Sequence, residues 1–157
     1  LQSVLKRAEG HRGTSFVEIY QNCNVFNDGA FSQFTEKETK DDNVLFLEHG
    51  KPLVFGKEHN KGIRLNGFTP EVVSLSDGNY SINDLLVHDE TDTTLAGILA
   101  DMTYKNALPR PIGVFLSIER PTYEAEMARQ IEFAKEKRGI GNIDRLLHSG
   151  ETWVIKQ

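Results

Sequence analysis

The side chain best suited to chemistry is the thiol of Cys23, the single cysteine of the chain, in the stretch FVEIYQNCNVFNDGAF at residues 16–31. A thiolate is a nucleophile and a metal ligand, but a lone cysteine in a buried strand is more often only a small apolar side chain. Residues 15–20 are rich in β-branched and aromatic side chains, which predicts a buried strand. Cys23 then follows the carboxyl end of a parallel strand, where open α/β sheets bind their ligands. From the residues alone, both interpretations stay open.

Other candidate residues form no recognisable catalytic set. The histidines lack the close spacing of zinc ligands, and His88, in a Val-His-Asp-Glu run, is interpreted as part of a surface loop. No Walker A loop, Gly-x-Gly-x-x-Gly or Gly-x-Ser-x-Gly motif is present. Basic residues among glycines and prolines in the middle of the chain offer an anion-binding surface, although solvated charge is the preferred interpretation for most of them. The histidines are His11, His49, His59, His88 and His148, and the basic residues are Lys51, Lys57, Lys61, Arg64 and Arg110.

Composition excludes several classes of protein. A chain of 157 residues with 38% hydrophobic residues is long enough for one soluble globular domain. The net charge of −5 is spread along the chain, so no basic stripe indicates a nucleic-acid partner. No apolar run approaches the roughly 18 residues that a membrane span needs. A single cysteine agrees with a reducing cytoplasm, and a start without Met, inside an apparent helix, predicts a piece of a longer chain.

Local patterns predict the elements that must position these residues. Apolar residues at helical spacing predict a first helix ending near Gly10, a second over residues 93–102 capped by Asp92, and a third from Thr122 to Gly139. Short apolar runs predict a hairpin, with several further strands. The hairpin strands are 44–47 and 53–55; the others are 62–65, 72–75, 112–118 and 152–155, while residues 32–42 form a loop or short surface helix and one helical turn lies within 143–157. A helix, a tight connection and a buried strand are typical of an α/β fold.

Several longer blocks, taken together, resemble one protein family. They resemble the β subunit of the 2-oxoacid:ferredoxin oxidoreductases, most closely the 2-oxoglutarate (α-ketoglutarate) type. The resemblance covers nearly the whole chain and weakens after about Phe133. The matching blocks, in order, are GTSFVEIYQNC (13–23), FNDG (26–29), LEHGKP (47–52), GIRL (62–65), LVHDE (86–90), PIGVF (111–115) and ERPTY (119–123).

The resemblance implies a thiamine diphosphate enzyme that oxidatively decarboxylates a 2-oxoacid. In this family the acyl group passes to coenzyme A, and electrons pass through a 4Fe–4S cluster to ferredoxin. The β subunit binds the diphosphate through Mg²⁺, held by a Gly-Asp-Gly segment and an Asn, and it works with an α subunit. Three cluster cysteines lie near the family's N-terminus and a fourth comes much later. Cys23 matches the fourth, and Gln21, Asn22 and Asn24 are then expected to donate hydrogen bonds near the sulfurs.

The departures from the family pattern also carry expectations. Because this sequence has no Gly-Asp-Gly segment and no second cysteine, the diphosphate site and three cluster ligands must lie upstream of Leu1, and the fragment alone is predicted to be inactive. Residues 1–42 are expected to form the C-terminal edge of a parallel-sheet, thiamine-diphosphate-binding α/β domain. Residues 43–157 are expected to form a mixed α+β C-terminal extension that contacts the α subunit, in part through the apolar face of the 93–102 helix.

Two further questions stay open at this stage. The alternative to an oxidoreductase fragment is an isolated, non-catalytic interaction or scaffold domain that contacts the partner subunit. The choice between 2-oxoglutarate and pyruvate as substrate also stays open, because no residue that binds the distal carboxylate is identified.

Overall fold

The computed structural model describes residues 1–105 and 107–155, and the chain divides into two compact units. Unit 1 contains Leu1–His11 and Ser15–Ile118, and unit 2 contains Arg12–Thr14 and Glu119–Gln157. The predicted division at residue 42, between the edge of a cofactor domain and an extension, stays a prediction.

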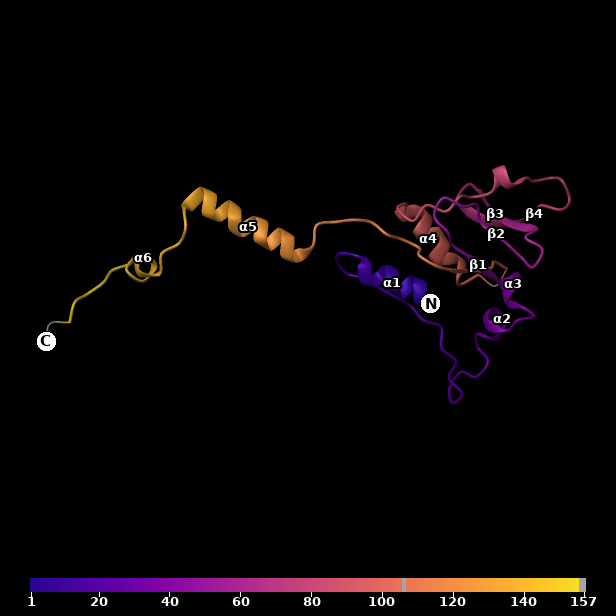
Figure 1. Cartoon of the computed structure of the whole chain (residues 1–157), viewed down its shortest axis with the longest axis horizontal. Coiled ribbons are helices and arrows are strands. Elements are labelled where there is room, and N and C mark those ends of the chain that lie inside the picture. Colours follow the sequence, from indigo (N-terminus) through magenta and orange to yellow (C-terminus); the bar gives the residue numbers. More distant parts are fainter. Residues whose placement is uncertain (106, 156–157) are drawn as a thin grey trace. The chain divides into compact units, whose positions relative to one another are not determined.

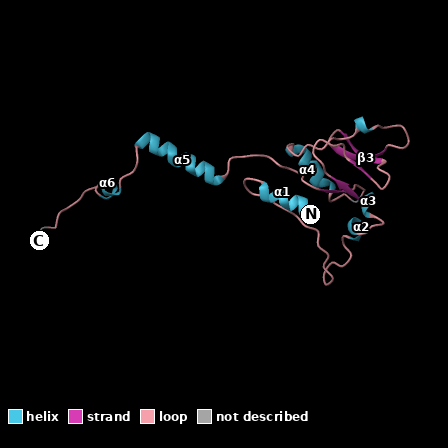
Figure 2. Ribbon diagram, viewed as in Figure 1, coloured by secondary structure: helices cyan, strands magenta, loops and turns pink. Residues whose placement is uncertain are grey.

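Unit 1 contains two small sheets of different kinds (Figures 1 and 2). Strand β1 (Val44–Phe46) pairs in parallel with β5 (Arg110–Ile112), so that Val44 is opposite Arg110 and Leu45 opposite Pro111. The second sheet is antiparallel and has the order β2–β3–β4, formed by Val54–Phe55, Lys61–Asn66 and Thr69–Ser74. Together with the helices, the two sheets confirm the α/β class.

The predicted strands over residues 62–65 and 72–75 are present as β3 and β4, which pair with each other through a very short connection. Asn66 is the last residue of β3, and it pairs with Thr69, so only Gly67 and Phe68 form the turn. Gly67 has φ of 62°, a left-handed conformation that glycine adopts without a steric cost. A positive φ at the first turn residue matches the right-handed twist of the flanking strands, which accounts for the tight connection.

The predicted hairpin between residues 44–47 and 53–55 is wrong, although both runs contain strands. Between them, the chain pairs with residues 86–88 instead: Gly50 N–H donates to His88 O, and His88 N–H donates to Lys51 O, both at 2.8 Å. Leu53 N–H then donates to Leu86 O at 2.8 Å. Because the intervening segment is held by this later part of the chain, β1 and β2 are free to join different sheets.

Helix α4 (Thr93–Met102) has the predicted bounds and closes the core of unit 1. Asp92 Oδ1 accepts hydrogen bonds from Thr94 N–H at 2.8 Å and Leu95 N–H at 3.1 Å, which caps the helix. The apolar face of α4 packs against the strands, so the prediction that this face contacts a partner subunit is wrong. The buried core consists of Leu45, Leu47, Leu53, Phe55, Ile63, Leu95, Leu99 and Met102.

The first helix of unit 1 is joined to a distant loop by an ion pair. Helix α1 (Gln2–Gly10) follows the predicted pattern, and the two terminal nitrogens of Arg7 each lie 2.7 Å from a carboxylate oxygen of Glu90. This contact lowers the pKa of the Glu90 carboxyl group and raises that of Arg7. The remaining short helical elements of unit 1 are α2 (Ser32–Thr35), α3 (Lys40–Asn43) and η1 (Ile82–Asp84).

Three predicted strands differ from the structure. Residues 15–20 are extended but form no described strand pair, and Phe16 is 89% exposed, so the predicted buried strand is wrong. Strand-forming side chains favour an extended backbone, but a strand also needs a neighbour with which to exchange hydrogen bonds. Residues 152–155 form no strand either, and the last two residues of the chain, 156–157, lie outside the described residues.

Of the third predicted strand, over residues 112–118, only Ile112 lies in a strand, the short β5, so this prediction is wrong for residues 113–118. Gly113 has φ of 144°, and a Cβ atom built on it would lie 2.9 Å from the carbonyl oxygen of Leu47. This close approach of two backbones turns the chain away from the ladder directly after Ile112.

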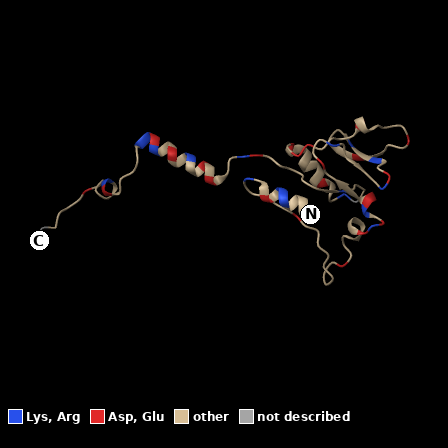
Figure 3. Cartoon of the chain, viewed as in Figure 1, with Lys and Arg blue, Asp and Glu red and all other residues tan. Residues whose placement is uncertain are grey.

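Unit 2 contains two capped helices, α5 (Tyr123–Arg138) and α6 (Ile143–Leu147). As predicted, Thr122 Oγ1 accepts a hydrogen bond from Ala125 N–H, and the helix ends at Gly139, which has φ of 79°. Acidic residues lie in the first turn of α5 and basic residues in the last, which is favourable for the helix dipole (Figure 3). Neither α5 nor α6 contains a buried residue. Among the described residues, no helix combines the length and apolarity that crossing a membrane requires.

Two glycines of unit 1 are expected to respond oppositely to alanine. A Cβ atom on Gly62 would lie 2.5 Å from Leu85 Cδ1 and 3.0 Å from Leu85 Cγ, so Gly62→Ala forces a buried side chain to move. We expect a loss of about 2 kcal/mol in the free energy of unfolding, measured by urea denaturation. The matched control is Gly97→Ala in α4, where no atom lies within 4 Å and we expect a gain of about 1 kcal/mol. Equal stability of the two variants would contradict this account.

Candidate thiol site

Cys23 lies in a loop that is closed by its own side chains. Asn27 N–H donates to Cys23 O at 2.9 Å, and the Asn22 side chain joins the two ends of the loop. Asn22 Nδ2 donates to Asn24 Oδ1 at 2.7 Å and to Asp28 Oδ1 at 2.9 Å, while Asn22 Oδ1 accepts from Gly29 N–H at 3.0 Å. The loop is therefore held in one shape by groups on both sides of the thiol.

The backbone of this loop favours the charged form of the Cys23 thiol. Hydrogen bonds from the backbone N–H groups of Phe26 and Val25, and a smaller one from Asn27, lower the pKa of Cys23. Desolvation acts in the opposite direction but is smaller than the two leading hydrogen bonds. The sequence predicts side-chain donors near the sulfur, whereas the Asn22 amide donates to Asn24 and Asp28, and backbone N–H groups take that position.

These surroundings fit one ligand of an iron–sulfur cluster. Metal ligation requires the thiolate, and N–H groups directed at a cluster sulfur tune its reduction potential. A 4Fe–4S cluster is held by four cysteine thiolates, and this sequence contains one. Within residues 1–105 and 107–155, no group of three or more His, Cys, Asp or Glu side chains is arranged to hold a metal ion. The role of Cys23 as a cluster ligand stays a prediction.

Aromatic and cationic side chains join the Cys23 loop to strand β5. Tyr20, which precedes the loop, stacks on Phe31, which follows it, with ring centroids 4.8 Å apart and planes 3° from parallel. The Arg110 guanidinium lies 5.6 Å from the Tyr20 ring centroid and 4.5 Å from that of Phe34. Tyr20 before the loop and Phe34 after it thus both contact Arg110 of β5.

The interpretation of His88 as a surface-loop residue is wrong. His88 is 1% exposed, and its Nε2 atom lies 2.8 Å from Val114 O, which can only accept, so this nitrogen carries the proton. Nδ1 is also buried and has no hydrogen-bond partner among the described atoms. The exposed member of this region is His49, whose Nδ1 accepts from Glu90 N–H at 3.2 Å. His88 therefore joins the 86–90 segment to the chain that follows β5.

The basic residues of the middle segment do not converge on one anion site. Lys61 Nζ lies 2.8 Å from Asp42 Oδ1, and Arg64 Nε lies 3.2 Å from Glu71 Oε2. Arg110 lies against aromatic rings, as described above. These three side chains have separate partners, so they form no common anion site, and solvated charge stays a prediction for Lys51 and Lys57.

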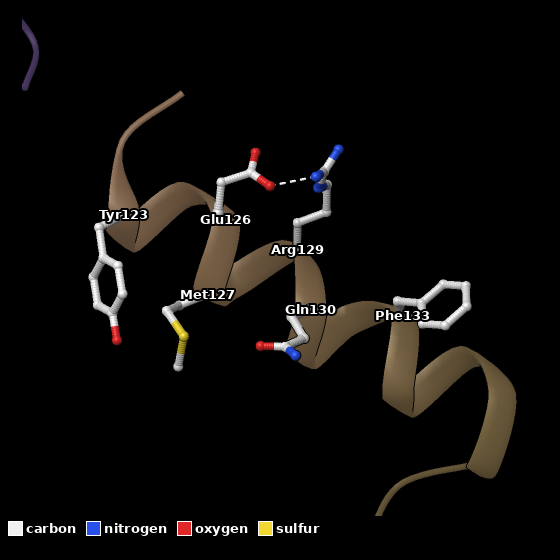
Figure 4. Close-up of a pocket in the computed structure, with 6 residues that line it drawn as sticks. All are labelled: Tyr123, Glu126, Met127, Arg129, Gln130 and Phe133. Carbon is white, nitrogen blue, oxygen red and sulfur yellow. Dashed lines mark hydrogen bonds and ion pairs between the residues drawn. The ribbon is translucent and has the colours of Figure 1, made fainter. Parts of the chain in front are cut away.

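Helix α5 has a shallow hollow on its surface (Figure 4). All of its lining residues belong to this single helix, and two of them, Glu126 and Arg129, form an ion pair with each other. With one helix as its only wall, the hollow has no opposing groups to hold a ligand. Its residues are Tyr123, Glu126, Met127, Arg129, Gln130 and Phe133.

Comparison with known proteins confirms the resemblance to an oxidoreductase β subunit. The match is to part of a longer protein. The relative is the 2-oxoglutarate oxidoreductase subunit KorB of Mycobacterium tuberculosis, which is 34% identical over 99% of this chain. The chain spans 42% of the length of that relative. No protein-family model matches the chain, and no solved structure matches it.

The lowered pKa of Cys23 predicts how the thiol reacts. Because backbone N–H groups favour the thiolate, its alkylation by iodoacetamide should rise at lower pH in the folded protein than in the protein unfolded in urea. Alkylation of thiol groups reports on Cys23 alone, since the sequence contains one thiol. Asn22→Ala removes the bonds that close the loop and should move the midpoint back upwards. Identical midpoints for folded and unfolded protein would contradict the N–H arrangement.

Proposed function

We propose that this chain is part of the β subunit of a 2-oxoacid:ferredoxin oxidoreductase and takes part in the oxidative decarboxylation of 2-oxoglutarate. The products are the acyl-coenzyme A and carbon dioxide, and ferredoxin is the electron acceptor. The observation that carries the proposal is the similarity to a 2-oxoglutarate oxidoreductase subunit over 99% of this chain. The single cysteine, typical of a reducing compartment, supports a cytoplasmic location.

In this proposal, Cys23 supplies one thiolate to a 4Fe–4S cluster. When bound, such a cluster accepts and passes on one electron at a time between the thiamine diphosphate site and ferredoxin. The N–H groups of Phe26 and Val25 lower the pKa of Cys23 and so favour its thiolate form. Asn22 keeps these donors in place, because its side chain bonds to both sides of the loop. The stacked rings of Tyr20 and Phe31 hold the ends of the loop together.

The rest of the assembly lies outside this chain in the proposal. Thiamine diphosphate, Mg²⁺ and the other cluster ligands are bound by residues of the full subunit that this sequence does not contain. The α subunit is the proposed protein partner. The 2-oxoacid and coenzyme A are bound by the complete enzyme.

Replacement of Cys23 tests the assignment in the full subunit assembled with its α subunit. Cys23→Ser should lower the iron content and abolish or alter the paramagnetic signal of the reduced cluster, because serine is a poor substitute for a thiolate. Val25→Ser is the matched control, because it places the same hydroxyl group two residues away on an exposed side chain and keeps the backbone N–H. Unchanged iron content and an unchanged signal in Cys23→Ser would leave the non-catalytic scaffold as the better function.

Substrate choice is tested by turnover of the purified full complex. We expect reduction of ferredoxin, or of a viologen dye, with 2-oxoglutarate and coenzyme A, and a lower kcat/KM with pyruvate. Reactions without coenzyme A provide the control for acyl transfer. A preference for pyruvate would keep the enzyme class and overturn the substrate.

A further inference from the structure

We propose that Arg110 is a positioning residue that clamps the Cys23 loop to the core of unit 1 through two aromatic rings. Its guanidinium lies 4.5 Å from the Phe34 ring centroid and 5.6 Å from the Tyr20 ring centroid. Its Nη1 atom also donates to the Tyr20 hydroxyl at 3.4 Å. Tyr20 lies before the thiol and Phe34 after it, so one side chain holds both sides of the loop.

The aromatic rings form a continuous group with the guanidinium. Tyr20 stacks on Phe31 at a centroid distance of 4.8 Å, and this stack closes the segment between them. A guanidinium is flat and weakly hydrated, so it packs on ring faces while it keeps its charge. Lysine has the same charge but no plane, and it cannot contact both rings in the same way.

The backbone of Arg110 is unusually well fixed for this task. Pro109 and Pro111 flank it, and a residue before proline is restricted to extended conformations. Arg110 also pairs with Val44 in the parallel sheet, and the neighbouring Pro111 is fully buried. The guanidinium therefore extends from a rigid point of the core to a loop that contributes no large side chain to the buried core.

The contacts of Arg110 differ from those of Lys61 and Arg64, two other basic residues of the middle segment. Lys61 and Arg64 pair with carboxylates of their own sheet region, Asp42 and Glu71. Arg64 also lies 5.0 Å from the Tyr80 ring centroid, so it makes a similar contact at a place remote in sequence from Cys23. Arg64 is thus a natural control for Arg110.

The clamp is tested by amide hydrogen exchange in the full subunit assembled with its α subunit. Arg110→Lys should speed exchange in residues 20–34 by about tenfold, because contacts with two rings are lost. Arg64→Lys should leave exchange in residues 20–34 unchanged. Tyr20→Phe keeps the ring but loses the hydroxyl that accepts from Arg110 Nη1, so it should speed exchange less than Arg110→Lys, whereas Tyr20→Leu should reproduce Arg110→Lys. Unchanged exchange in Arg110→Lys, or equally faster exchange throughout unit 1, would overturn the clamp.

The role of the clamp in positioning the Cys23 thiolate rests on the proposed function, and a second measurement separates this role from the existence of the clamp. If Cys23 binds the cluster, Arg110→Lys and Tyr20→Leu should shift the cluster's reduction potential and paramagnetic signal, whereas Arg64→Lys should not. Faster exchange in residues 20–34 with an unchanged potential would keep the clamp and overturn its role in positioning the thiolate. Full retention of iron in Cys23→Ser would overturn the proposed function, while the exchange experiment would still decide whether the clamp exists.

Discussion

The parallel pairing of β1 with β5 joins residues that are far apart in the sequence. It places Leu45, which is fully buried, in the core with Leu99 of α4. Burial of a leucine side chain contributes about 2 kcal/mol, so each of these contacts is a substantial part of the stability of a small domain. The same pairing places Arg110 beside Val44, where it reaches the aromatic rings around the Cys23 loop. Core packing and the position of the loop therefore depend on one short ladder.

The Cys23 loop obtains its order in a different way from the core. Two aromatic side chains of this region, Phe16 and Phe26, are 89% and 91% exposed, so burial of these rings does not hold the loop. Side-chain bonds from Asn22, the Tyr20–Phe31 stack and the cation–π contacts of Arg110 replace that burial. Each of these interactions is directional, so together they hold the loop in a defined shape.

Some features of the fold follow from residues that are neighbours in the sequence, whereas others depend on residues far along the chain. Helices α4 and α5 are predicted with their caps because Asp92 and Thr122 bond to backbone groups two or three residues away. The pairing of β1 depends on a strand beyond residue 100, and no local pattern around Val44 identifies it. His88 shows the same limit, because the carbonyl that accepts its proton belongs to Val114. Cys23 is predicted as a site residue through a family resemblance, whereas the contact of Arg110 with Tyr20 arises only on folding.

The short turn at Gly67 and Phe68 contrasts with the long separation between β1 and β5. Contacts between neighbours in sequence form quickly, whereas closing a long chain segment is slow. During synthesis, β3 and β4 can therefore pair before Arg110, the partner of Val44 in the parallel sheet, has left the ribosome. In that interval the core that buries Leu45 and Leu53 is incomplete, so the nascent chain exposes apolar surface, a state that favours aggregation.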